Sequence, residues 1–327
     1  MMNYDIDKYR LTVVLGPTAC GKTRFAVQLA GKSGAEIISA DSRQIYRGMD
    51  IGTGKDLGEY EWNGRPVPYH LIDIVDAGVR YDIYRYQRDF AAAYNGIVSR
   101  GNPVILCGGS GLYIESVTRN YAIPDVPADP ALRAELEQYS DEYLIGLLKS
   151  LTTPHNTTDY DTRKRLIRSI EIAMYQKEHP DDTGIFRAGG AEDPADGTCR
   201  PCRQTVPVAS EECPPSLVRF APEDVHYIGL SVSREERIAR IDRRLDARLG
   251  EGLVEEVRKL LDSGLSPEDL IYYGLEYKFV TLYLIGQLSY DEMHDRLAIA
   301  IHQFAKRQMT WFRGMERRGM HIDWVEV

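Results

Sequence analysis

Eight consecutive residues near the start of the chain have the types and spacing of a phosphate-binding loop. They match the pattern G-x-x-x-x-G-K-[ST] and are Gly16, Pro17, Thr18, Ala19, Cys20, Gly21, Lys22 and Thr23. In this pattern, glycines let successive backbone N–H groups converge on phosphate oxygens, and the helix that begins at the loop points its positive end at them. Lys22 adds a point charge, and Thr23 offers a hydroxyl ligand for Mg²⁺. The motif predicts a phosphorylated ligand without specifying which one.

A carboxylate, Asp41, lies in a second apolar segment, residues 36–42, just past its apolar part. The carboxyl ends of strands in an open α/β sheet face the ligand crevice. A carboxylate at that place can take a proton from a nucleophile or hold a metal-bound water. The pair Asp41-Ser42 is equally suited to an Asx turn or a helix cap. Spacing alone leaves both interpretations open.

Glycines and a serine end a further apolar segment, residues 102–109, in the run Gly108-Gly109-Ser110-Gly111. Glycine permits close approach of the backbone to a ligand, and the Ser110 hydroxyl can hydrogen-bond to that ligand. An ordinary β-to-α turn has the same composition, so this signal is also open. A P-loop kinase usually places a Mg²⁺-binding Asp at a strand end. Here only Asp73 and Asp76, in the segment LIDIVD, offer that alternative.

Strand-like and helix-like segments alternate over the first 120 residues. Strands are expected at residues 11–16, 36–42, 69–76 and 102–109, with a helix at 84–97. The pattern returns later, with a strand at 225–232, a long helix at 290–315 and a final strand at 321–327. Such alternation predicts an α/β fold, a P-loop NTPase-like parallel sheet with helices on both faces.

The pattern changes near Tyr121, where a proline-rich entry leads to a helix with Asp129 as its cap and Pro130 at its first position. Helical segments continue to Met174. We therefore expect a core formed by residues 1–121 plus 217–327, interrupted by a mostly helical insertion.

The insertion is expected at residues 122–216, and its last part, about 178–216, has the composition of a flexible loop. That loop holds Cys199 and Cys202, with Cys213 further on. Three thiolates are fewer than the four ligands of a closed structural zinc site, and His226, which could be the fourth, falls in an expected core strand. We therefore expect no structural zinc there.

Composition limits the function classes. The 327 residues carry a net charge of −9, which argues against binding nucleic acid by overall charge. Any contact with RNA must use local basic clusters, such as those at residues 163–168, 237–248 and 306–318. The first ten residues lack the apolar core of a secretory signal, no run is long enough to span a bilayer, and five cysteines form no dense framework. We expect a cytoplasmic, monomeric protein without a membrane partner.

Taken together, the ordered motifs resemble those of the tRNA dimethylallyltransferase family. The segments that carry the resemblance are GPTACGKT, ISADSRQIYRGMDIGTGK, HLIDI, GGSGLYI, RLIRSIEI, SREERIARIDRRLD, SYDEM and QFAKRQMTWFRG. They cover most of the chain except residues 178–216. The resemblance implies a P-loop core with a helical insertion that grips the tRNA anticodon arm. It also implies transfer of a dimethylallyl group from dimethylallyl diphosphate to N6 of the adenine 3′-adjacent to the anticodon, at position 37, with release of diphosphate.

The resemblance also implies roles for single residues. The loop from Gly16 to Thr23 would bind the diphosphate, with Mg²⁺ at Thr23. Three residues would be catalytic: Asp41 at the adenine amine, Arg244 at the diphosphate, and Ser110. Ser110 stands where relatives often have Thr. The implied tRNA contacts are Asp41, Ser42, Arg43, Gln44, Arg133, Lys164, Arg165 and Arg168.

Three departures from the family pattern bear on tRNA contacts. The usual H-P-x-D is replaced over His155 to Asp161, the usual glycine of the G-Y-[RK]-[EQ] box is Glu276, and a usual arginine is His302. Three other functions remain as alternatives. These are a small-molecule P-loop kinase or NTPase, a non-catalytic RNA-binding protein, and a prenyltransferase for free adenine nucleotides.

Overall fold

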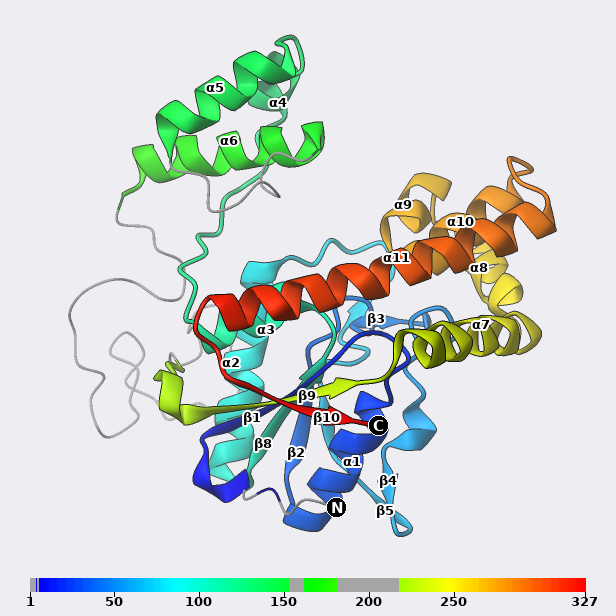
Figure 1. Ribbon diagram of the computed structural model, residues 1–327. Helices are drawn as coiled ribbons and strands as arrows, with labels where there is room; N and C mark the ends of the chain where they lie inside the picture. Colours follow the sequence, from blue (N-terminus) through cyan, green and yellow to red (C-terminus); the bar gives the residue numbers. More distant parts are fainter. Residues whose placement is uncertain (1–3, 5, 153–161, 181–217) are drawn as a thin grey trace. The chain divides into compact units, whose positions relative to one another are not determined.

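The computed structural model describes residue 4 and residues 6–152, 162–180 and 218–327. The chain divides into two compact units, residues 1–120 with 199–327, and residues 121–198. Each unit is described by itself (Figure 1). The His155 to Asp161 departure and the three cysteines of the predicted loop lie outside the described residues.

A six-stranded sheet forms the centre of the first unit. In spatial order its strands are β10 (Ile322–Glu326), β9 (Val225–Ser231), β1 (Leu11–Leu15), β8 (Val104–Gly108), β2 (Glu36–Ser39) and β6 (Tyr69–His70). Every neighbouring pair is parallel. The predicted parallel sheet is confirmed, and so are the late strands that return to it.

Successive residues of each strand point to opposite faces, and both faces are covered by helices. Val13 belongs to a large apolar cluster with residues of α2 (Ile83–Ser99), α3 (Gly111–Thr118) and α11 (Tyr290–Arg317). Its neighbour Val14 belongs to a second cluster with residues of α1 (Lys22–Ser33). Both valines are fully buried, as expected for strands covered on two sides.

The single strand predicted over residues 69–76 is wrong. Its first part, β6, pairs with β2, whereas its last part, β7 (Val75–Asp76), pairs with β3 (Tyr46–Arg47) in a separate two-stranded sheet. Between them Leu71 and Asp73 adopt positive φ angles of 60° and 57°. This left-handed backbone cannot continue a strand. The apolar residues there are buried in a turn rather than in the sheet.

Helices and one small hairpin complete the first unit. They are α7 (Arg234–Gly250), α8 (Leu253–Asp262), α9 (Pro267–Tyr272), α10 (Leu275–Leu284) and the hairpin of β4 (Glu61–Trp62) and β5 (Arg65–Pro66). The long helix α11 begins with a capping box, in which Ser289 and Glu292 each accept a hydrogen bond from the other's backbone N–H. No helix in the described ranges is long and apolar enough to cross a membrane.

The second unit contains α4 (Pro130–Leu136), α5 (Asp141–Leu151) and α6 (Arg163–Glu178). Asp129 caps α4 by accepting hydrogen bonds from the N–H groups of Ala131 and Leu132, both at 3.0 Å, as its sequence predicts. Leucine and isoleucine side chains of the three helices form a separate apolar core. The described part of the insertion is therefore helical.

Candidate active site

The carboxyl ends of four neighbouring strands carry the candidate residues. The register pairs Leu15 of β1 with Gly108 of β8 and with Gly229 of β9, and Ser39 of β2 with Cys107 of β8. The segments that follow β1, β8, β2 and β9 therefore begin at the same edge of the sheet. They carry the phosphate loop, Ser110, Asp41 and α7.

The phosphate loop folds tightly around the start of α1. Ala19 and Gly21 have positive φ angles of 63° and 82°. A side chain at Gly16 would begin 2.7 Å from the Cys20 sulfur, so only glycine fits there. Lys22 begins α1, and its ammonium donates to the Pro17 carbonyl at 3.2 Å. The loop thus has the wrapped backbone and the helix N-terminus that bind anions.

Gln308 of α11 joins two of these loops and was not predicted. Its Oε1 accepts a hydrogen bond from the Thr18 N–H at 2.8 Å, and its Nε2 donates to the Gly109 carbonyl at 3.0 Å. The side chain is buried, and a Cβ at Gly109 would lie 2.4 Å from that Nε2. The signal was in the sequence, since Gln308 interrupts the apolar stripe that Ala305 and Phe312 continue.

Arg244 of α7 reaches the phosphate loop, where its Nη2 donates a hydrogen bond to the Thr18 hydroxyl. Burial, together with the neighbouring Arg248, lowers the pKa of Arg244 to about 10. The guanidinium therefore stays charged at neutral pH. The structure brings together Arg244 and the loop, as the prediction of a diphosphate ligand requires.

Asp41 forms the turn that its sequence allows. Its Oδ1 accepts a hydrogen bond from the Arg43 N–H at 3.0 Å, two residues on, and its own N–H donates to the Ser39 hydroxyl at 3.3 Å. One carboxylate oxygen thus fixes the turn. Asp41 remains partly exposed, so its second oxygen can serve a ligand. The two interpretations left open by the sequence are compatible.

Ser110 ties the end of β8 to the Asp41 turn. Its hydroxyl accepts a hydrogen bond from the Ser42 N–H at 3.1 Å, and its own N–H donates to the Ala40 carbonyl at 3.1 Å. A side chain at Gly108 would begin 2.2 Å from that carbonyl. Glycine is therefore needed at position 108, because the backbone after β2 passes too close for a side chain. Ser110 positions the segment that begins with Asp41.

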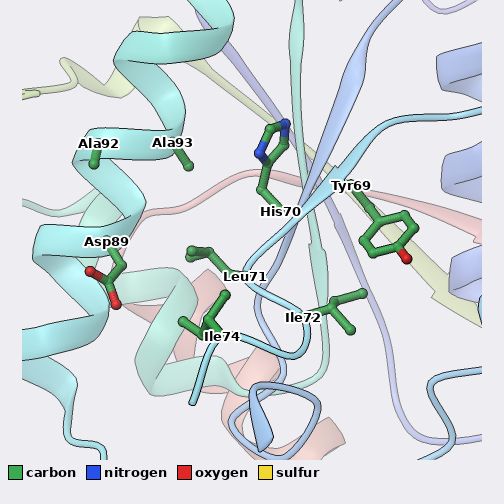
Figure 2. A pocket seen from close by; sticks show the side chains of 8 residues that line it. All are labelled: Tyr69, His70, Leu71, Ile72, Ile74, Asp89, Ala92 and Ala93. Carbon is green, nitrogen blue, oxygen red and sulfur yellow. The ribbon is translucent and has the colours of Figure 1, made fainter. Parts of the chain in front are cut away.

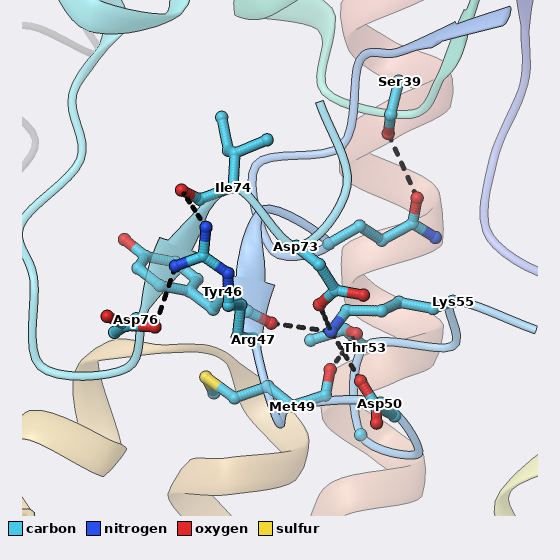
Figure 3. Close-up of polar contacts among 12 residues, drawn as sticks. Ser39, Tyr46, Arg47, Met49, Asp50, Thr53, Lys55, Asp73, Ile74 and Asp76 are labelled. Atoms are coloured by element: carbon cyan, nitrogen blue, oxygen red, sulfur yellow. Dashed lines mark hydrogen bonds and ion pairs between the residues drawn. The ribbon is translucent and has the colours of Figure 1, made fainter. Parts of the chain in front are cut away.

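The predicted tRNA contact Gln44 is buried and engaged inside the protein. Its Oε1 accepts from the Ser39 hydroxyl at 3.1 Å, and its Nε2 donates to the Gly54 carbonyl at 3.0 Å. Figure 3 shows Ser39, which makes the first of these contacts, together with the network of Lys55. Gln44 therefore holds the loop that follows Asp41.

Lys55 is buried and forms the second anchor of that loop. Its ammonium donates to the Tyr46 carbonyl and to the Asp50 carboxylate, both at 2.6 Å, and also contacts Asp73 (Figure 3). Asp76 pairs with Arg47 at 2.9 Å. The two acids that could have held Mg²⁺ in a kinase-like site thus have structural partners.

Apart from Arg43, which follows Asp41 in the first unit, the basic residues predicted to contact tRNA lie on α4 and α6 of the second unit. Arg133 forms two hydrogen bonds with the buried Glu171, at 3.0 and 2.7 Å, and Arg168 pairs with the same carboxylate. Lys164 and Arg165 are exposed on the first turn of α6. The structure therefore divides this group into two residues that build the unit and two on its surface.

A hollow of about 480 Å³ lies elsewhere on the first unit. Figure 2 shows its lining residues, which are Tyr69, His70, Leu71, Ile72, Ile74, Asp89, Ala92 and Ala93. None of them belongs to the phosphate loop or to the Asp41 turn. The hollow is therefore distinct from the candidate site.

Comparisons with known proteins agree with the arrangement. The family model described as IPP transferase matches residues 44–315. The chain is 51% identical to tRNA dimethylallyltransferase 1 of Porphyromonas gingivalis, over 97% of this chain and 94% of that protein. The chain belongs to the tRNA dimethylallyltransferase family.

Further relatives support this membership. The chain is 51% identical to tRNA dimethylallyltransferase 2 of Bacteroides fragilis, over 98% of this chain and 93% of the relative. The fold also matches the crystal structure of a full-length tRNA isopentenylpyrophosphate transferase from Bacillus halodurans, with a TM-score of 0.63 and 30% sequence identity. The match covers 98% of this chain and 90% of that one. The fold class and the family inferred from the sequence motifs are confirmed.

Proposed function

We propose that the chain transfers a dimethylallyl group from dimethylallyl diphosphate to N6 of the adenine 3′-adjacent to the anticodon, at position 37 of tRNA, and releases diphosphate. The chain belongs to this family, and one structural observation supports the proposal. A phosphate loop, an arginine bonded to it and a carboxylate turn lie at one edge of the sheet, linked by Gln308 and Ser110. That edge can hold an anionic leaving group beside a base.

The diphosphate end would lie on the phosphate loop. As the bond between C1 of the dimethylallyl group and the diphosphate oxygen breaks, negative charge develops on that oxygen. Backbone N–H groups, Lys22 and Arg244 stabilise such charge because they are already oriented before the reaction. The hydrogen bond from Arg244 to the Thr18 hydroxyl keeps the guanidinium at the loop.

Mg²⁺ fits this site if it arrives with the diphosphate. The described part of the chain has no group of three or more His, Cys, Asp or Glu side chains that could hold a metal ion. Mg²⁺ commonly binds through one or two protein oxygens plus substrate phosphates and waters. Thr23, on the first turn of α1, offers such an oxygen. Bound there, the ion would neutralise charge on the leaving group.

Asp41 would act as the base. The exocyclic amine of adenine is a weak nucleophile, since its lone pair is delocalised into the ring. As the bond from N6 to C1 forms, N6 loses one proton, which passes to the Asp41 carboxylate. Ser110 would hold the Asp41 turn in place through Ser42.

The second unit would bind the anticodon arm, with Lys164 and Arg165 as exposed cations near phosphates. Protein–RNA recognition commonly targets single-stranded loops whose bases splay out. The adenine must leave the loop stack to reach Asp41, which costs a few kcal/mol. We propose a monomer that acts in the cytoplasm.

The experiment is mass spectrometry of nucleosides from tRNA incubated with the protein, Mg²⁺ and dimethylallyl diphosphate. Adenosine carrying one five-carbon unit at the position 3′ of the anticodon is expected, and Lys22→Ala should abolish it while tRNA binding persists. Unmodified tRNA, together with ATP turnover without RNA, would instead support a P-loop kinase. Modification of free adenine nucleotides but not of tRNA would also overturn the proposal.

A further inference from the structure

Helix α7 presents a second arginine on the face that carries Arg244. Arg248 follows four residues later, so the two Cβ atoms lie on one face of the helix, about 5–6 Å apart. Arg244 bonds to Thr18 in the phosphate loop, so this face is directed to the candidate diphosphate site. Burial and the nearby Arg248 lower the pKa of Arg244, as expected for two cations that share a small space.

Arg248 is buried, with 7% of its surface exposed, and among the described residues its guanidinium has only two carboxylates at ion-pair distance. The carboxylates of Asp56 and Glu276 lie 3.9 and 4.0 Å from its guanidinium nitrogens, beyond hydrogen-bond length. A guanidinium has five N–H donors, and a buried charge without hydrogen bonds is unfavourable. An anion at the site would supply the missing acceptors.

The guanidinium of Arg248 lies against the backbone of a neighbouring loop. It packs on Gly54, where a Cβ would clash directly with Nη2. The Gly54 loop is fixed in turn by Glu256, which accepts hydrogen bonds from the N–H groups of Ile51 at 2.8 Å and Gly52 at 3.0 Å. Arg248 therefore packs on a loop whose backbone is itself held by hydrogen bonds.

Glu276 supplies the nearby negative charge. It lies in the first turn of α10, and its side chain is 19% exposed. Burial raises the pKa of Glu276, the nearby Arg248 and Arg244 oppose that rise, and Asp41 adds to it. The carboxylate thus lies 4.0 Å from Arg248 and is influenced by the charges of Arg244 and of the proposed base. It stands where the sequence resemblance led us to expect glycine.

We propose that Arg248 is a second diphosphate-binding cation and that Glu276 is the counter-ion it gives up when the diphosphate binds. The inference rests on the proposed function, which places the diphosphate on the phosphate loop. A guanidinium matches phosphate oxygens with two parallel N–H donors. Two arginines one helical turn apart suit two linked phosphoryl groups, so Arg248 favours a diphosphate over a monophosphate.

The test is isothermal titration calorimetry of the full chain with inorganic pyrophosphate and with inorganic phosphate, each with Mg²⁺. Arg248→Met should weaken pyrophosphate binding by about 10–100-fold, the value of a charge-assisted hydrogen bond, and phosphate binding far less. Arg248→Lys keeps the charge without the fork and should recover part of the loss. The matched control is Arg243→Met, because Arg243 is an exposed arginine that pairs with Glu236.

Glu276→Gln gives an independent result in the opposite direction. Removal of the competing carboxylate should tighten pyrophosphate binding several-fold, whereas the melting temperature should fall because the buried guanidinium of Arg248 loses a counter-ion. A purely structural glutamate would lower stability without tightening binding. This variant also decides the matter if Arg248→Met fails to fold.

The outcomes separate the inference from the proposed function. If the unmodified chain binds pyrophosphate, Lys22→Ala loses it, and Arg248→Met equals Arg243→Met, then Arg248 is not a ligand and the inference is overturned. An unchanged or weaker affinity in Glu276→Gln overturns the role of the counter-ion. If neither the unmodified chain nor Arg243→Met binds pyrophosphate, the proposed function itself fails.

Discussion

The sheet edge of the first unit and the first turn of α6 in the second unit place their polar side chains in opposite ways. At the sheet edge, Gln308 is buried and hydrogen-bonded both to the phosphate loop and to the loop after β8. Arg244 donates a hydrogen bond to the Thr18 hydroxyl of the phosphate loop. On α6, Lys164 and Arg165 are exposed. Transfer chemistry needs groups fixed before the reaction, whereas attraction of a polyanion needs accessible charge. The two regions should therefore respond differently to mutation and to salt.

Among the variants that compare these two regions, Asp41→Asn should have the largest effect. The amide keeps the size of the side chain but cannot accept the N6 proton, and loss of a positioned base costs about 10²–10⁴-fold in rate. Single-turnover transfer should slow by that factor. Binding of tRNA, measured by filter retention, should weaken only modestly. A near-normal single-turnover rate would show that Asp41 is not the base and only stabilises the turn through its hydrogen bond with Arg43.

Gln308→Leu should have the next largest effect. It leaves the Thr18 N–H and the Gly109 carbonyl without their partner, at a cost of about 1–3 kcal/mol. The phosphate loop should lose order, and KM for dimethylallyl diphosphate should rise about tenfold or more. Steady-state kinetics measure this, with Gln303→Leu on the exposed side of α11 as control. Equal effects of the two variants would show that Gln308 only fills space.

Exchange of Lys164 and Arg165 for alanine should weaken tRNA binding about tenfold and leave the rate at saturating tRNA unchanged. The slope of log affinity against log salt should fall by about 1–2, because each phosphate contact contributes nearly one released counter-ion. Lys149→Ala with Lys177→Ala, also exposed in the second unit, is the charge-matched control. The same loss in both double variants would indicate a general charge effect rather than a contact surface.

The sequence predicts those parts of the site that directly follow parallel strands, because the carboxyl ends of such strands meet at one edge of the sheet. The phosphate loop, Asp41 and Ser110 each follow an apolar segment, so pattern alone brings them to one sheet edge. Gln308 was missed because its role depends on where a helix about 200 residues beyond Gly109 packs. A glutamine within the apolar stripe of α11 indicates a buried polar side chain, but local sequence does not say which loops that side chain contacts.

Two other features were beyond the sequence for physical reasons. The strand expected over residues 69–76 is broken at Leu71, a residue type that rarely adopts a positive φ and so gives no warning. The pairing of Arg248 with Glu276 depends on the packing of α7 and α10 around the Gly54 loop. Arg248 appeared in the sequence only as part of a basic cluster.

A last prediction concerns Glu36, at the amino end of β2 and so at the edge opposite the candidate site. Burial alone would raise the pKa of Glu36, but hydrogen bonds from Arg100, Asn102 and His70 outweigh it and lower the pKa to about 2. This carboxylate therefore stabilises the fold above its unfolded pKa of 4.5, and the contribution is lost as pH falls from about 4.5 to about 2. Glu36→Gln should lower the free energy of unfolding by about 2 kcal/mol at pH 7, less than the full shift because Arg100 is half exposed. The difference from the unmodified chain should shrink in urea titrations at pH 4 and further at pH 3.

Transfer at pH 7 should stay normal, since no contact of Glu36 reaches the phosphate loop. A variant that lost transfer while its stability was unchanged would contradict the division of the sheet into a structural edge and a functional edge.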